Sequence, residues 1–239
     1  MIHRGCSGVS DRRVIVSIVT LLVAAVGTPA RAGAAADPTL APYAALVRSP
    51  AGTALLRRAR AAMEHHWAPA EPDRRRPAVA TPDSVPSVAW PAAPVGVYLS
   101  LVRGRATRAC IGREGASFAT LSDAVEALAV EVLTADRRRP PLRHEDLAAL
   151  RVVVSFAGEG EPIADPMLAD PGREGLSIAT PRGVVAFLPG EARTVAWALR
   201  ESRRIGVLDG GVSSASYRRF PVVVLSEPEV PSLPEGDTR

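Results

Sequence analysis

Apolar residues recur at helical spacing in three parts of the chain. In residues 52–66 and 121–135, apolar side chains return every three or four positions, which predicts two helices with one apolar face each. Residues 191–204 carry a third such pattern, and Gly206 follows it as a typical helix stop. The apolar face of each predicted helix therefore points into the protein.

Extended patterns alternate with these helices. Residues 97–101 and 107–111 flank a turn at Arg103-Gly104, which predicts a β-hairpin. Residues 150–157 are apolar on both faces and predict a central strand, preceded by a short helical turn at 144–147. The pattern further predicts a second hairpin (175–178 and 184–188), a final strand (220–225) and a loop (158–171).

The first 32 residues have the three parts of a secretory leader. Arginines at 4, 12 and 13 precede an apolar stretch at 14–26, and Ala30-Arg31-Ala32 offers a cleavage site. The stretch is shorter than the about 20 apolar residues that a membrane span needs, which favours cleavage; an uncleaved anchor stays open as the alternative. We expect an exported protein, periplasmic or extracellular, with no stable membrane anchor after cleavage.

The remaining chain divides into three regions by composition. Residues 33–51 are predicted to be a spacer and residues 52–227 the folded domain, with a proline-rich loop at 68–94. Residues 228–239 are predicted to be a disordered tail, because they are rich in proline and charge and poor in apolar residues.

The charge of the chain changes when the leader is removed. All 29 basic residues are arginines; the leader holds four of them and one acid, so 25 arginines and 24 acids remain. A nearly neutral protein lacks the net basic charge that nucleic-acid surfaces need, so we predict no nucleic-acid partner.

The two cysteines are Cys6, in the leader, and Cys110. After cleavage no second cysteine remains for a disulfide within the chain. Alternation along a strand places Arg108, Cys110 and Gly112 on one face. A nucleophilic thiol there would need a cation nearby, such as Arg108. Alternatively, Cys110 is a small apolar residue packed under Gly112, or it links two chains.

Metal and cofactor sites are not indicated. His65 and His66 are adjacent at the end of a predicted helix, so their side chains diverge and cannot easily share a metal ion. No spacing of Cys, His and acidic residues fits a zinc or iron site, and no glycine-rich phosphate loop opens a helix. We therefore predict no metal and no cofactor.

The segment Arg108-Ala109-Cys110-Ile111-Gly112 resembles the arginine-glycine-cysteine-isoleucine-glycine signature of the AMMECR domain family. The order of predicted elements from Leu55 to Glu227 is similar to that family throughout. After the second helix, further residues match the family pattern: Asp136, Arg138, Pro141 and Leu142. On these residues the chain is identified as a divergent, exported bacterial member.

The resemblance implies an α+β fold of two lobes, with an antiparallel-rich sheet, flanking helices and a cleft near the cysteine motif. It implies no settled reaction, and Val153 stands where family members carry an acid. The leading hypothesis is a non-catalytic module that binds a protein or small-molecule ligand through Arg108, Cys110, Ile111 and Gly112. The alternative is a thiol-dependent enzyme that uses Cys110 with Arg108.

Overall fold

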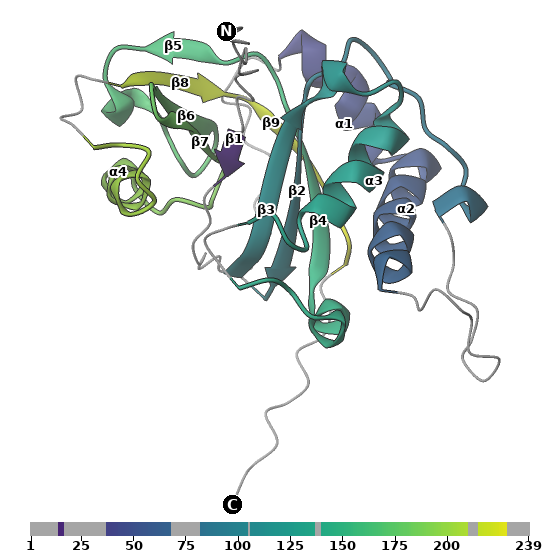
Figure 1. Cartoon of the computed structure of the whole chain (residues 1–239). Coiled ribbons are helices and arrows are strands. Elements are labelled where there is room, and N and C mark those ends of the chain that lie inside the picture. Colours follow the sequence, from purple (N-terminus) through teal and green to yellow (C-terminus); the bar gives the residue numbers. More distant parts are fainter. Residues whose placement is uncertain are drawn as a thin grey trace, which may run out of the picture.

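The computed structural model describes residues 14–16, 37–67, 82–104, 106–136, 140–209 and 215–228. Helices and two mainly antiparallel sheets form a larger and a smaller lobe, which confirms the predicted α+β class (Figure 1). Most of the predicted leader, residues 68–81 of the proline-rich loop and residues 229–239 of the tail lie outside the described residues. Within the described residues, no helix is both long and apolar enough to cross a bilayer.

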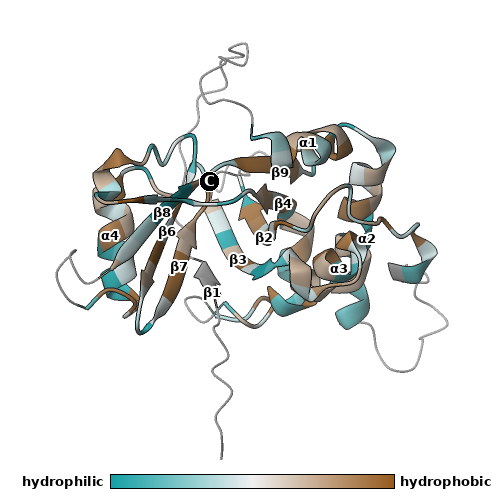
Figure 2. Cartoon of the chain, turned by 90° about the horizontal axis from the view of Figure 1, so that it is seen from above, coloured by the Kyte–Doolittle hydropathy of each residue, from teal (hydrophilic) through white to brown (hydrophobic). Residues whose placement is uncertain are grey.

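The larger lobe is built on a four-stranded antiparallel sheet in the order β3-β2-β4-β9. Its helices lie together on one side of this sheet (Figures 1 and 2). The elements are β2 (Gly96–Arg103), β3 (Ala106–Glu114), β4 (Arg151–Ala157), β9 (Val222–Ser226), α1 (Ala41–Val47), α2 (Pro50–His66) and α3 (Leu121–Glu131). The predicted hairpin of β2 and β3 is confirmed, and β4 is an interior strand as predicted.

Strand alternation separates the two faces of this sheet. Leu99, Ile111 and Val154 belong to the core that packs against the helices. Their strand neighbours Ser100 and Cys110 lie on the other face, because successive side chains of a strand point in opposite directions. That face is turned toward the smaller lobe, so one strand serves both the helix-side core and the contact between lobes.

The smaller lobe contains a five-stranded sheet in the order β1-β7-β6-β8-β5. α4 (Val195–Arg204) packs its apolar stripe on this sheet, and the Thr194 hydroxyl caps the helix by accepting a bond from the Trp197 amide (3.1 Å). The strands are β1 (Val14–Val16), β5 (Glu161–Ile163), β6 (Gly175–Thr180), β7 (Gly183–Phe187) and β8 (Ser216–Phe220). All its strand pairs are antiparallel except β1 with β7.

Several predicted boundaries are wrong, each for a local reason. The predicted loop 158–171 contains β5 and a 3-10 turn, η5 (Pro166–Leu168). The predicted last strand, 220–225, corresponds to β9, and the strand before it, β8, was not predicted; Pro221, which lacks an N–H, separates the two. The third predicted helix begins only at Val195, after its Thr194 cap.

Short elements account for the other differences. α1 and η1 (Pro38–Leu40) lie in residues predicted to be spacer, and β1 lies in the predicted leader. The remaining 3-10 turns are η2 (Pro82–Ser84), η3 (Gly115–Ser117) and η4 (His144–Ala149), of which η4 is the predicted helical turn before β4.

Candidate functional site

A cluster of small and aromatic side chains joins the two sheets. We name the following set the junction cluster: Cys110, Ala157, Ala186, Leu188 and Phe220, with Tyr98 and Val222 packed against them. β2, β3 and β4 contribute from the larger sheet, and β7 and β8 contribute from the smaller one. The motif cysteine is therefore part of the contact between lobes.

Two glycines make room for the stacked aromatic pair in this cluster. Tyr98 and Phe220 lie with ring centroids 6.4 Å apart and planes at 9°. A Cβ on Gly112 would lie 2.2 Å from the Tyr98 ring, and a Cβ on Gly175 would lie 2.1 Å from the Phe220 ring. Both positions require glycine, since real Cβ atoms do not approach that closely.

Cys110 is buried at this junction, with 2% of its surface exposed. Its backbone N–H donates to the Asp136 carboxylate at 3.3 Å, which ties β3 to the segment after α3. On β2, Ser100 is the residue directly opposite, and it is buried too. The thiol is therefore held among packed neighbours, as the packing interpretation of Cys110 expects.

Arg108 occupies an irregular position on the same strand. The register of β2 with β3 passes from Leu101 opposite Ala109 to Val102 opposite Thr107, so Arg108 is the extra residue of a β-bulge. Bulges re-aim side chains and are frequent beside functional sites. Arg108 is partly exposed, and within the described residues its guanidinium makes no hydrogen bond or ion pair.

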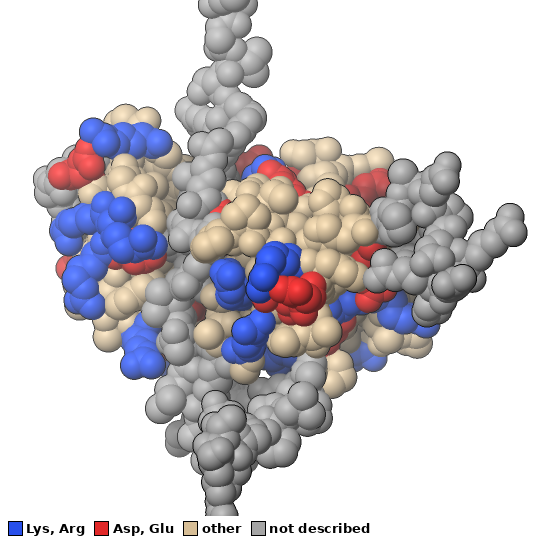
Figure 3. Space-filling view, turned by 60° about the horizontal axis from the view of Figure 1, so that its bottom comes forward, with Lys and Arg blue, Asp and Glu red and all other residues tan. Residues whose placement is uncertain are grey.

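The field of Arg108 acts on the Asp146 carboxylate of η4. A backbone N–H from Arg143 lowers the pKa of Asp146 most, and the fields of Arg143, Arg103 and Arg108 lower that pKa further. Arg103 also forms an ion pair with Asp146 at 3.5 Å. Basic and acidic side chains lie next to each other on this end of the molecule (Figure 3).

The sequence-predicted site residues thus lie in three places: the junction, the helix-side core and the bulge. Cys110 and Gly112 lie at the junction, where Gly112 supports the Tyr98 ring. Ile111 lies on the opposite face of β3, in the core beneath the helices. Its side chain is therefore not brought together with Cys110, and the field of Arg108 acts on the Asp146 carboxylate.

Tyr98 and Glu191 are site residues that the sequence analysis did not single out. Burial raises the pKa of Tyr98 strongly, and the charges of Cys110, Glu191 and Glu114 raise that pKa further. The Glu191 carboxylate, 6% exposed, accepts a bond from the Leu188 amide at 2.8 Å. Glycine at 112, directly after the predicted strand 107–111, was the available signal for a large neighbour such as Tyr98.

β1 lies beside the same junction. It pairs with β7 and also contacts β3, and it lies between these two strands in Figure 1. Its last residue, Val16, is opposite Ala186 of the junction cluster. An extended segment can therefore occupy the space where the edges of the two sheets meet.

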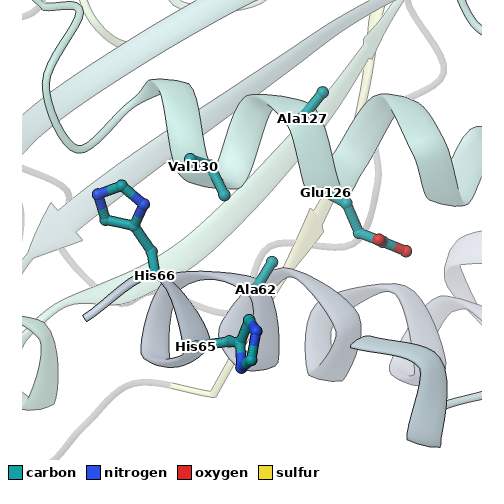
Figure 4. Close-up of a pocket in the computed structure, with 6 residues that line it drawn as sticks. All are labelled: Ala62, His65, His66, Glu126, Ala127 and Val130. Atoms are coloured by element: carbon teal, nitrogen blue, oxygen red, sulfur yellow. The ribbon is translucent and has the colours of Figure 1, made fainter. Parts of the chain in front are cut away.

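A separate open groove lies between α2 and α3 and has a volume of about 360 Å³. Its lining is Ala62, His65, His66, Glu126, Ala127 and Val130. Figure 4 shows the two imidazoles leaving α2 in different directions, as expected for adjacent helical residues. Among the described residues, no three His, Cys, Asp or Glu side chains gather as a metal site.

Comparison with known protein families and solved structures finds matches that cover most of the predicted domain. The family model AMMECR1 matches residues 56–221. The chain belongs to the AMMECR1 family. The structure is also similar to the crystal structure of the uncharacterized protein PH0010 from Pyrococcus horikoshii, with a TM-score of 0.51 and 25% sequence identity over 74% of this chain and 91% of that one. No curated protein matches this chain.

The AMMECR1 match covers β2 to β8, and so contains most of the junction cluster. β1 and α1 lie before the matched residues, and β9 lies after them. The strand that covers β7 therefore belongs to the part of this chain outside the AMMECR1 match.

Proposed function

We propose that this AMMECR1 protein is an exported, non-catalytic binding module whose ligand lies along β3, at the junction of the two sheets. The observation that carries the proposal is the position of Arg108. Its guanidinium stands at a bulge, partly exposed and without a described partner, two residues before Cys110 of the junction cluster. A planar guanidinium in that position is suited to an anionic group of a protein or small ligand.

The burial of Cys110 supports binding over catalysis. A nucleophilic cysteine works as a thiolate and has to be reached by its substrate. Here the side chain packs with Ala186 and Phe220, and only 2% of the Cys110 surface is exposed. In this proposal Gly112 holds Tyr98 in place, and the backbone around Ile111 continues the strand that carries Arg108.

Binding can be tested with inorganic phosphate, citrate and a short acidic peptide as probes in calorimetric titrations. We expect saturable binding of at least one probe, weakened about tenfold by Arg108→Gln through loss of a charge-assisted hydrogen bond. Arg57→Gln is the matched control, because Arg57 is an exposed arginine on α2. Equal affinity in Arg108→Gln and parent protein, or no binding of any probe, would contradict the proposal.

Export rests on the leader pattern of residues 1–32 and has its own test. We expect the protein to be recovered from the periplasm or medium with its N-terminus at Gly33, as determined by mass spectrometry of the intact chain. Recovery of the whole chain, Met1 included, from the cytoplasm alone would refute this part of the proposal.

A thiol-dependent enzyme is the second candidate, and one observation favours it. Tyr98, Cys110 and Glu191 are close enough that the charges of the last two raise the pKa of the Tyr98 hydroxyl. Three ionisable groups therefore share one buried region, as catalytic groups do.

Iodoacetamide distinguishes the two functions. A nucleophilic Cys110 with Arg108 as charge partner reacts readily and keeps reacting well below the ordinary thiol pKa. The binding module reacts slowly at every pH until urea unfolds it. Fast labelling of the folded chain that Arg108→Gln shifts to higher pH would replace the binding proposal with the enzyme.

A further inference from the structure

Exposed sheet edges need protection, because their unpaired N–H and C=O groups can pair with any extended chain. The smaller sheet ends at β5 on one side. β5 has only three residues, includes Pro162, and carries an ion pair between Glu161 and Arg219 at 2.9 Å. Short length, proline and charge all oppose the addition of a further strand there.

The edges of the larger sheet are protected by other means. β3 is interrupted by the bulge at Arg108 and carries Arg113, and both features discourage regular pairing. β9 directly follows Pro221 and is contacted by α1. These three edges therefore carry recognised devices against strand addition.

β7 has none of these devices. Its residues Gly183–Phe187 pair with β6 without interruption and include no charge and no proline. Val185 and Phe187 point into the core of the smaller lobe, and Ala186 joins the junction cluster. The outer edge of β7 is instead covered by β1, in parallel register from Val14 opposite Val184 to Val16 opposite Ala186.

We propose that the outer edge of β7 is an acceptor for an extended, apolar peptide segment in parallel orientation, occupied in the unprocessed chain by the leader residues Val14–Val16. The inference deepens the proposed function and rests on it, since it names an extended peptide as the ligand class at the junction. Three consecutive β-branched residues favour the strand conformation, and main-chain hydrogen bonds give such segments their affinity.

Processing of the leader then acts on this edge directly. Cleavage after Ala32 removes β1 from the chain, so the β7 edge loses its covalent occupant. An extended segment of a partner protein can pair with the vacated edge, beside β3, which β1 contacts. The leader and the partner segment compete for the same backbone groups, so the unprocessed chain is self-occupied.

Hydrogen–deuterium exchange of the purified full-length chain tests whether Val14–Val16 occupy the outer edge of β7. Ile15→Pro removes an N–H and blocks pairing in the middle of β1. We expect about tenfold faster exchange of the amides in residues 184–186, with β6 and β8 unchanged. Ala24→Pro is the matched control, because it places proline in the leader outside β1. Equal exchange in the two variants overturns the proposal.

A synthetic peptide of residues 11–19 then tests whether the outer edge of β7 binds a separate peptide chain. Added to the Ile15→Pro chain, it should restore the protection of residues 184–186, whereas the same residues in reversed order should not, because parallel register depends on chain direction. Failure of the forward peptide, or equal protection by both, overturns the proposal. If the parent protein binds none of the anionic probes while the forward peptide still protects residues 184–186, the proposed function alone has failed.

Discussion

Gly112, the last residue of the cysteine motif, lies directly against the Tyr98 ring. The ring occupies the place of a side chain at position 112 and continues across the junction to Phe220. A glycine in a strand costs conformational entropy, so its presence here is explained by the ring that it admits.

Gly112→Ala is expected to destabilise the protein by about 1–3 kcal/mol, because the new Cβ must displace the Tyr98 ring from its stack. Urea denaturation measures this cost. Gly172→Ala is the matched control: its Cβ would meet only the exposed carboxylate of Asp170, at 3.3 Å. Adding Tyr98→Leu to Gly112→Ala should cost less than the sum of the two single changes, and strict additivity would argue against this contact.

The raised pKa of Tyr98 predicts that the folded protein loses stability at alkaline pH. Burial first, then the charges of Cys110 and Glu191, raise its pKa above the ordinary value of 10. The folded state therefore holds this proton more tightly than the unfolded state. The contribution is fully present below pH 10 and is lost as the pH rises toward the raised pKa.

Urea midpoints measured from about pH 9 to pH 11.5 test this prediction. We expect Tyr98→Phe to reduce the alkaline fall in the free energy of unfolding, since phenylalanine has no proton to lose. Some fall should remain, because burial raises the pKa of Tyr43 and of Tyr217 as well. An unchanged slope in Tyr98→Phe would show that the hydroxyl is not buried as described.

At the scale of elements, Arg60 connects α2 to the start of β4 and to the residue after β9. Its guanidinium donates to the carbonyls of Leu147 (2.9 Å) and Leu150 (2.8 Å) and pairs with the Glu227 carboxylate. The same carboxylate accepts a bond from the Val152 amide at 2.7 Å. One side chain thus joins α2, the start of β4 and the residue after β9.

Arg60→Ala is expected to cost about 2–3 kcal/mol in the free energy of unfolding, because it leaves two carbonyls and a partly buried carboxylate without this donor. Arg57→Ala, an exposed change on the same helix, should stay within about 0.5 kcal/mol. Chemical denaturation of the two variants provides the comparison. Equal effects would mean that the Arg60 contacts add no stability.

At the scale of the whole molecule, Phe220 is the side chain that couples the lobes. It is 5% exposed, stacks on Tyr98 from the other sheet and fills the space left by Gly175. The two lobes have separate cores, one beneath α1, α2 and α3 and one beneath α4. Their cooperation in unfolding therefore depends on the junction cluster.

Phe220→Ala is expected to lower stability by about 3–5 kcal/mol and to separate the unfolding of the two lobes. In a Trp67→Phe, Trp90→Phe background, Trp197 fluorescence reports the smaller lobe, and circular dichroism reports the whole chain. The two transitions should coincide without the Phe220 change and diverge with it. Phe118→Ala, outside the junction cluster, serves as control. Coincident transitions in Phe220→Ala would place the coupling elsewhere.

Most helices and strands followed from local pattern, and the site followed only in part. The hairpin of β2 and β3, the interior strand β4 and the hairpin of β6 and β7 were predicted, because period-two alternation and turn residues act over short distances. The pairing of Tyr98 with Phe220 was not, since it joins residues more than a hundred positions apart. β1 was assigned to the leader alone, because an apolar run is consistent with both an h-region and a strand.

The sequence by itself determined the α+β class and the family, and alternation along β3 placed Cys110 and Gly112 on one face and Ile111 on the other. The tertiary structure alone decided which face meets the second lobe, that Arg108 stands at a bulge beside Asp146, and that the leader residues Val14–Val16 lie along β7. The physical reason is the distance along the chain over which each kind of interaction acts. Side-chain periodicity and turn geometry are properties of a few consecutive residues, whereas packing between sheets is decided by shapes that come together only when the chain folds.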